Sequence, residues 1–121
     1  MKVVIVDDEW FGLDITYRLL TQIRIDLEVV AFFQDSREAL DKIPMLHPDL
    51  IILDAEMPHI SGFEMYERLK DMNAHFLLVS AHGENYLRVR VADDQVRFLI
   101  KPFSKADMSL LLNSLSIRSN C

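Results

Sequence analysis

Three acidic residues, a serine and a lysine stand where short apolar runs of the sequence end. Asp7 and Asp8 follow residues 2–6, Asp54 follows 50–53, Ser80 follows 76–79 and Lys101 follows 96–100. Two carboxylates about 4 Å apart repel each other by roughly 4 kcal/mol at an effective dielectric of about 20, and one lysine cannot offset three of them. If the acids meet, they require a hard divalent cation, and an all-oxygen, carboxylate-rich site suits Mg²⁺ or Mn²⁺.

The glycines restrict the phosphate chemistry that this chain supports. Gly12, Gly62 and Gly83 are scattered, so neither GxxxxGK[ST] nor GxGxxG occurs, and the standard nucleotide-cradling loops are excluded. A carboxylate beside a metal ion and a lysine can instead attack phosphorus and form an acyl phosphate. Phosphoryl transfer depends mainly on positioning and charge neutralisation. The cation and Lys101 would supply the neutralisation, and the Ser80 hydroxyl would bond a phosphoryl oxygen.

Short apolar runs alternate with segments of helical periodicity, and this alternation must position those side chains. The apolar runs cover residues 2–6, 27–33, 50–53, 76–79 and 96–100. Such runs are typical of parallel strands that are covered on both faces. Helices are expected over residues 11–23, 36–45 and 84–92, and capping signals at Ser61 and Ser104 open two more. The pattern predicts an alternating (βα)5 α/β fold with a five-stranded, doubly wound, flavodoxin-like parallel sheet, whose sites lie beyond the carboxyl ends of the strands.

Length and composition favour one globular domain over residues 1–121. Half of the 121 residues are hydrophobic, and three glycines and four prolines are too few for a disordered or collagen-like chain. The net charge of −6 argues against a nucleic-acid surface in this segment. The single cysteine, Cys121, excludes an internal disulfide, and no run resembles a signal peptide or a membrane span, so a cytoplasmic location is expected.

Taken together, the strand-end residues resemble the response-regulator receiver domain (CheY-like) of two-component signalling. The matching runs are VDDE (residues 6–9), LDAEMP (53–58) with Gly62 after it, SA (80–81) and KPF (101–103), in the family's order along essentially the whole chain. The resemblance implies that Asp54 accepts a phosphoryl group from the phosphohistidine of a sensor histidine kinase. It also implies that Asp7, Asp8, Asp54 and the backbone carbonyl of Glu56 hold Mg²⁺.

The resemblance further implies how phosphorylation is read out. Ser80 matches the switch hydroxyl, and Lys101 matches the phosphate-pairing lysine, whose bond to the following proline is typically cis in this family. Phe98 falls where the family has an aromatic residue that rotates between two states. Glu56 and His82 occupy positions that tune the lifetime of the phosphoryl group. The face built by the fourth helix, the fifth strand and the last helix would carry signalling and, after phosphorylation, dimerisation.

Each of these residues also has a plain structural explanation. An isolated Asp7 or Asp8 would cap the first helix, and an isolated Ser80 would be a turn residue or a helix cap. Lys101 alone would be a solvated side chain, and Phe98, an aromatic residue in a strand, is core by default. What favours the functional interpretation is that the acids, the serine and the lysine occur together at strand ends.

Two other functions stay open at this stage. A metal-dependent phosphohydrolase would use Asp7 or Asp8 as its nucleophile, although the acids are adjacent and the chain has no cap domain. A receiver-like interaction module would signal without phosphorylation, although the complete set of acids, serine and lysine argues against it. The favoured hypothesis is a switch whose own chemistry is limited to self-phosphorylation and slow autodephosphorylation. Its expected output is transcription, with DNA bound only through an output domain outside this chain and with no membrane partner.

Overall fold

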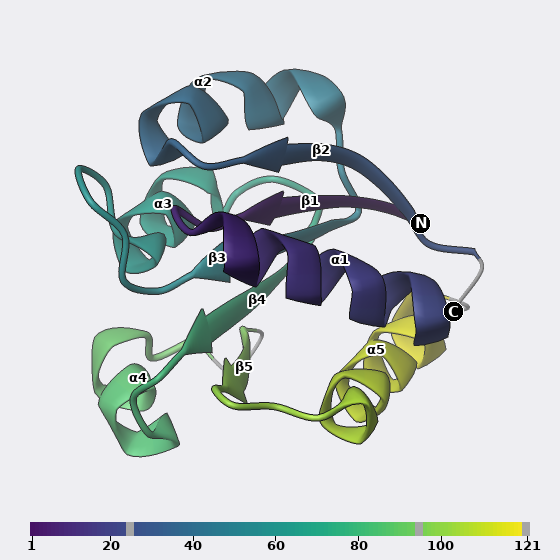
Figure 1. The fold of residues 1–121 in the computed structure, drawn as a ribbon. Helices are drawn as coiled ribbons and strands as arrows, with labels where there is room; N and C mark the ends of the chain where they lie inside the picture. Colours follow the sequence, from purple (N-terminus) through teal and green to yellow (C-terminus); the bar gives the residue numbers. More distant parts are fainter. Residues whose placement is uncertain (24–25, 94–95, 120–121) are drawn as a thin grey trace.

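A computed structural model describes residues 1–23, 26–93 and 96–119, and within them strands and helices alternate along the chain (Figure 1). The strands are β1 (Lys2–Val6), β2 (Glu28–Phe33), β3 (Leu50–Asp54), β4 (His75–Ser80) and β5 (Arg97–Ile100). The helices are α1 (Trp10–Ile23), α2 (Ser36–Leu46), α3 (Gly62–Leu69), α4 (Glu84–Arg90) and α5 (Lys105–Ser119). The predicted alternation is therefore confirmed. Asp94, Gln95 and Cys121 lie outside the described residues.

The strands form one parallel sheet in the order β2-β1-β3-β4-β5, which confirms the predicted doubly wound, flavodoxin-like arrangement. The strand order reverses between β1 and β3, and sheets of this kind bind ligands outside the carboxyl ends of the strands at that point. Those ends lie at the left of Figure 1, where the arrowheads of β1 and β4 point. The topology thus places the ends of β1 and β3 at the expected position of a binding site.

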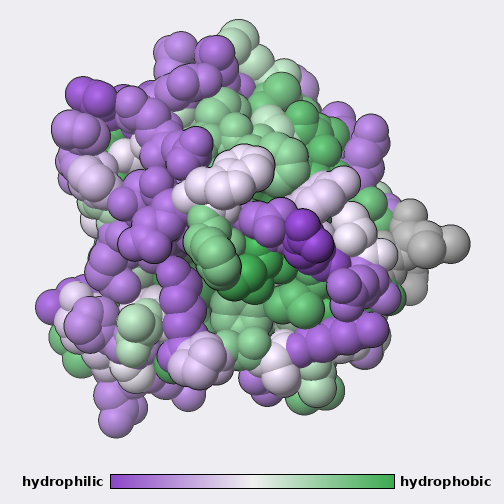
Figure 2. All heavy atoms as spheres, viewed as in Figure 1, coloured by the Kyte–Doolittle hydropathy of each residue, from purple (hydrophilic) through white to green (hydrophobic). Residues whose placement is uncertain are grey.

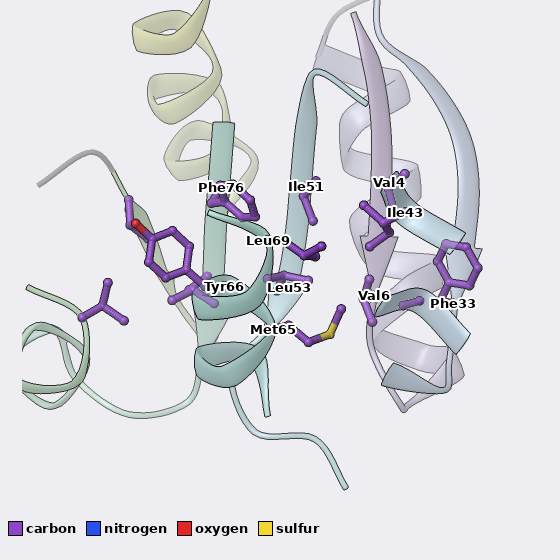
Figure 3. Close-up of a cluster of buried hydrophobic side chains, with 14 residues drawn as sticks. Val4, Val6, Phe33, Ile43, Ile51, Leu53, Met65, Tyr66, Leu69 and Phe76 are labelled. Atoms are coloured by element: carbon purple, nitrogen blue, oxygen red, sulfur yellow. The ribbon is translucent and has the colours of Figure 1, made fainter. Parts of the chain in front are cut away.

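Two hydrophobic layers hold the sheet between its helices. Because neighbouring residues of a strand point to opposite faces, Ile51 and Ile52 belong to different layers. Figure 3 shows the layer beneath α2 and α3, which includes Val4, Val6, Ile43, Ile51, Leu53, Met65 and Leu69. The other layer joins α1 and α5 to the opposite face and includes Ile5, Leu13, Leu20, Ile52, Met108 and Leu112. This double cover explains why the strand sequences are nearly continuously apolar.

The element bounds differ from the predicted ones by one or two residues, and the largest difference concerns the end of α4. The helix ends at Arg90, two residues before the predicted end at Ala92. Val91 has an extended backbone, with φ −130° and ψ 104°, and its side chain is buried. A β-branched residue that packs into the core prefers this conformation to the helical one. The helix is therefore short, and its last side chains remain exposed.

The outer side of α1 carries exposed aromatic residues. Trp10 is 63% exposed and Phe11 is 74% exposed, directly after the acidic run that follows β1. A shallow groove of about 290 Å³ is lined by Trp10, Leu13, Asp14, Tyr17 and Phe32. Figure 2 shows hydrophobic residues gathered at the centre of this face, around α1, with a mostly hydrophilic rim.

Within the described ranges, no helix is long and apolar enough to cross a membrane.

Candidate functional site

The carboxyl ends of β1 and β3 bring three acidic side chains into one cluster. Asp7, Asp8 and Asp54 each offer a carboxylate oxygen, and these oxygens all lie within 4.8 Å of one another. Asp7 is 6% exposed and Asp54 is 8% exposed. Residues that are 46 positions or more apart in the sequence therefore meet as predicted, and their charges are largely withdrawn from water.

Backbone N–H groups fix the two buried carboxylates. The N–H of Glu9 donates to Oδ1 of Asp7 at 2.9 Å, and the N–H of Glu56 donates to Oδ1 of Asp54 at 3.3 Å. Each aspartate thus binds the backbone two residues further along, as in an Asx turn. The second oxygen of each carboxylate faces Lys101, whose Nζ lies 3.9 Å from Oδ2 of Asp7 and 3.8 Å from Oδ2 of Asp54. The peptide bond between Lys101 and Pro102 is cis, as the resemblance implies.

The electrostatics of the cluster favour a bound cation. Burial, and then repulsion by Asp7, raise the pKa of Asp54 to about 7, and Lys101 opposes this shift without cancelling it. One ammonium group leaves the triad with a net negative charge. Hard carboxylate oxygens are the ligands that Mg²⁺ prefers. The triad therefore fits a Mg²⁺ site of the kind that is typical of receiver domains.

Two glycines allow the chain to pass close to these acids. A Cβ added to Gly12, in the first turn of α1, would lie 2.0 Å from Oδ2 of Asp7. A Cβ added to Gly62 would lie 2.4 Å from the carbonyl oxygen of Asp54 and 2.8 Å from Cα of Ala55. In the sequence, Gly62 is part of a family motif, whereas Gly12 belongs to no motif. Its position one helical turn beyond the acidic run is the signal that could have identified it.

Ser80 ends β4 beside the acidic cluster, but its hydroxyl is bonded to a different carboxylate. Ser80 Oγ lies 3.0 Å from both side-chain oxygens of Glu56, and it accepts the N–H of His82 at 3.0 Å. Ser80 is fully buried, whereas Glu56 is exposed. The position of Ser80 at the strand end follows from the sequence, but its bond to Glu56 does not.

Phe98 in β5 is half-buried and packs against the core layer that contains Val91 and Val96. The guanidinium of Arg88 lies 4.3 Å from the centroid of the Phe98 ring. A contact of this kind is worth about 0.5–1 kcal/mol at an exposed site. Phe98 therefore has the structural role that an aromatic residue in a strand usually has, and it also has a cationic partner on α4 that sequence analysis missed.

The residues around α4 make further contacts that sequence analysis did not anticipate. The His82 ring stacks on Tyr86, with centroids 4.3 Å apart, and the guanidinium of Arg90 lies 3.6 Å from the centroid of the same Tyr86 ring. The spacing of these three residues, four apart along the chain, is the signal that could have shown the stack. The Tyr66 hydroxyl of α3 donates to the carboxylate of Asp93, which ties the segment after α4 to α3.

Comparison with known proteins agrees with the geometry. The family model described as the response regulator receiver domain matches residues 3–113. The chain is 40% identical over 107 residues to a protein-glutamate methylesterase/protein-glutamine glutaminase of Methanospirillum hungatei, covering 84% of this chain and 31% of that protein. It is 30% identical over 115 residues to the transcriptional regulatory protein BtsR of Salmonella typhimurium, covering 95% of this chain and 48% of that protein.

Solved structures share the fold. The receiver domain of NarL from Mycobacterium tuberculosis has a TM-score of 0.81 at 25% identity and covers 95% of each chain. The isolated REC domain of RcsB from Salmonella enterica serovar Typhimurium, determined with the phosphomimetic BeF₃⁻, has a TM-score of 0.84 at 23% identity, covering 96% of this chain and 88% of that one. The chain spans less than half the length of the two curated relatives named above. With an acidic pocket at the switch point of the sheet and a family match over nearly its whole length, the chain belongs to the response regulator receiver domain family.

Proposed function

We propose that this chain is a phosphorylation-controlled switch in which Asp54 accepts a phosphoryl group from the phosphohistidine of a sensor histidine kinase. In the transfer, a carboxylate oxygen of Asp54 attacks phosphorus, the P–N bond breaks, and the histidine nitrogen keeps the electron pair. The observation that carries the proposal is the position of Asp54, which lies beside Asp7 and Asp8 and 3.8 Å from the ammonium group of Lys101. A divalent cation at this site would supply charge neutralisation for the phosphoryl oxygens.

The metal would be held by Asp7, Asp8, Asp54 and the backbone carbonyl of Glu56. Mg²⁺ is the proposed ion, with Mn²⁺ as an alternative, because all of these ligands are oxygen atoms. Lys101 lies within 3.9 Å of two of the carboxylates, so it would pair with the phosphoryl group after transfer.

The readout would pass from Ser80 to Phe98. Ser80 would turn to bond a phosphoryl oxygen, and the space it leaves would let Phe98 rotate inward. Rotation would release Phe98 from Arg88 and change the face formed by α4, β5 and α5. A difference of about 3 kcal/mol between the two states would shift their populations roughly 150-fold.

The chemistry of the switch is limited to self-phosphorylation and slow autodephosphorylation, as the family implies, and this argues against a phosphohydrolase. We propose that Glu56 and His82 set the lifetime of the acyl phosphate. Glu56 contacts Ser80 through its carboxylate and His82 contacts it through its backbone N–H, so both residues border the pocket, and their side chains would control how water approaches the phosphoryl group.

The proposed output is transcription, exerted through a domain outside this chain that would bind DNA. The 30% identity to BtsR over 95% of this chain supports it. The 40% identity to the Methanospirillum hungatei methylesterase favours a second candidate, control of a covalently attached catalytic domain. Either output would use the α4-β5-α5 face. For transcription, this face would form a homodimer on phosphorylation. The proposed location is the cytoplasm, with a kinase and no membrane lipid as the direct partner.

Intact mass after incubation with acetyl phosphate tests the phosphoryl acceptor. We expect one phosphoryl adduct that requires Mg²⁺ and is removed by hydroxylamine, as an acyl phosphate is. Asp54→Asn should abolish the adduct, whereas Asp41→Asn, at an exposed position of α2, should keep it. An adduct that persists in Asp54→Asn would contradict the assignment. If neither acetyl phosphate nor a histidine kinase gave an adduct, the phosphorylation-independent module would replace the switch.

A further inference from the structure

We propose that the Glu56 carboxylate is an off-state latch on the Ser80 hydroxyl, which the phosphoryl group displaces when the switch turns on. The proposal rests on the proposed function and adds to it a specific competitor for the switch residue. Its starting point is geometric: Ser80 Oγ lies 3.0 Å from each side-chain oxygen of Glu56. Glu56 is two residues after Asp54, and its N–H donates to the Asp54 carboxylate, so the latch is anchored beside the phosphoryl acceptor.

The bonds of the Ser80 hydroxyl make this a competition. A hydroxyl has one proton to donate, and Ser80 directs it to Glu56. Ser80 Oγ also accepts the N–H of His82 at 3.0 Å. A phosphoryl dianion on Asp54 has only acceptor oxygens, so Ser80 can bond it only by withdrawing its proton from Glu56. Glu56 and the phosphoryl group therefore exclude each other as partners of Ser80.

Burial decides how the latch opens: the Ser80 side chain can only turn about a fixed backbone, whereas the Glu56 side chain can leave the pocket. Ser80 is fully buried and its carbonyl accepts the N–H of Lys101 at 2.7 Å, so the backbone at this position is held in the sheet. Glu56 is exposed, and its side chain can swing into water at little cost. Phosphorylation brings the charge at Asp54 toward −2, which repels the Glu56 carboxylate. The added charge thus opens the latch and leaves the Ser80 proton for the phosphoryl group.

The same hydroxyl connects the latch to α4. His82 donates its N–H to Ser80 Oγ, and its ring stacks on the ring of Tyr86. The guanidinium of Arg90 contacts the same Tyr86 ring. When Ser80 leaves Glu56 and rotates, the acceptor of the His82 N–H moves with it. The amide resonance of His82 should therefore report whether the latch is closed or open.

Beryllofluoride with Mg²⁺, a stable mimic of the phosphoryl group, tests the latch in the full chain. Glu56→Ala should bind beryllofluoride about tenfold more tightly than the wild-type chain, because a charge-assisted hydrogen bond no longer has to be broken. Glu56→Asp keeps the charge but is one methylene shorter and no longer reaches Ser80, so it should show a similar gain. If Glu56→Asp binds like the wild type while Glu56→Ala binds more tightly, charge alone explains the effect and the latch is wrong.

A double-mutant cycle with Ser80→Ala gives a second test. A latch acts only through the Ser80 hydroxyl, so Glu56→Ala should change the beryllofluoride affinity less than twofold in the Ser80→Ala chain. The same tenfold gain with and without Ser80 would overturn the latch. In the ligand-free chain, Glu56→Ala should also move the His82 amide resonance toward its position in the beryllofluoride-bound wild type, and an unmoved resonance would overturn it.

These outcomes separate the latch from the switch itself. A wild-type chain that fails to bind beryllofluoride in the presence of Mg²⁺ would overturn the proposed function and the latch together. A wild-type chain that binds it, with an unchanged affinity in Glu56→Ala, would overturn the latch alone. Because Glu56 is exposed, both of its variants are expected to fold.

Discussion

At the ends of β1 and β3, buried carboxylates are fixed by backbone N–H groups, whereas at the end of β4 and along α4 many polar contacts involve exposed side chains. Asp7 and Asp54 belong to the first region, and every residue of β3 is buried. Glu56, Arg88 and Arg90 belong to the second, and each can release its partner without leaving a charge buried. We call the first the rigid region, because its carboxylates are buried and held by the backbone, and the second the exchangeable region, because its contacts can open without burying a charge.

The two regions also differ in how much core they contribute. α1, which follows the acidic run, has fourteen residues and buries Leu13, Thr16 and Leu20. α4 has seven residues, and Leu87 is the buried one. A helix this short is not stable by itself, so its position depends on the contacts around it. Segments of low local stability are the ones that move in switching proteins.

Overpacking the rigid region should have the largest effect on the free energy of unfolding. Gly62→Ala would place a Cβ 2.4 Å from the carbonyl oxygen of Asp54, a backbone atom that cannot move away alone. We expect a loss of about 3 kcal/mol in the free energy of unfolding, measured by urea denaturation. Gly83→Ala, at the start of α4, is the matched control, because its Cβ would meet no described heavy atom within 4 Å. It should cost less than about 1 kcal/mol. Equal losses in the two variants would show that the two regions do not differ in how tightly they are packed.

Neutralising the buried acid should have the next largest effect. Without metal, Asp54→Asn should stabilise the chain at pH 8 by about 2 kcal/mol, because it removes a buried charge beside Asp7. The pKa of Asp54 is about 7 in the folded chain against an ordinary value of 3.8. The folded state therefore binds the proton more tightly, and wild-type stability falls as pH rises from about 4 to about 7.

The gain in the free energy of unfolding from Asp54→Asn should accordingly grow between pH 4 and 7 and stay constant above that range. Urea denaturation in EDTA at pH 4 and pH 8 measures this gain. Saturating Mg²⁺ should reduce the gain. The control is Asp14→Asn, whose exposed ion pair with Arg18 should contribute less than about 0.5 kcal/mol at either pH. If Asp54→Asn stabilises the chain by the same amount at both pH values, folding does not raise the pKa of the Asp54 carboxyl.

The contact between Arg88 and Phe98, in the exchangeable region, should have the smallest effect. A double-mutant cycle with Arg88→Met and Phe98→Leu should give a coupling free energy of about 0.5 kcal/mol. A coupling this small is what a contact that opens during switching requires. Additive effects of the two substitutions would show that Arg88 does not restrain the ring, and a coupling above about 2 kcal/mol would place this contact in the rigid region.

Much of the rigid region could be predicted from the sequence. Apolar runs that end at Asp7 and Asp54 give the strands and their polar ends, because parallel strands place their carboxyl ends at one edge. The N-cap at Ser61 also appears as predicted, with its hydroxyl accepting the N–H of Glu64 at 3.1 Å. These features depend on local sequence and on the topology, and the periodicity of the chain encodes both.

The exchangeable region could not be predicted in the same way. The bond between Glu56 and Ser80 joins residues 24 positions apart, and it depends on the rotamer of an exposed side chain. Arg88 was absent from the predicted site because an arginine on a short helix is usually solvated, and only the structure shows it against Phe98. The early end of α4 likewise follows from the burial of Val91, which is a tertiary effect.

If chemistry at the carboxylates of the rigid region is read out by the exchangeable region, backbone amide resonances will show it. Spectra of the chain would be compared without metal, with Mg²⁺, and with Mg²⁺ and beryllofluoride. We predict that Mg²⁺ alone affects the neighbours of Asp7, Asp8 and Asp54. Beryllofluoride should in addition shift the amides from His82 through α4 to Phe98, while the interior of β1 and β3 stays unchanged. Shifts confined to the neighbours of Asp54, or equally large in β1, β3 and α4, would show that the two regions do not have separate roles.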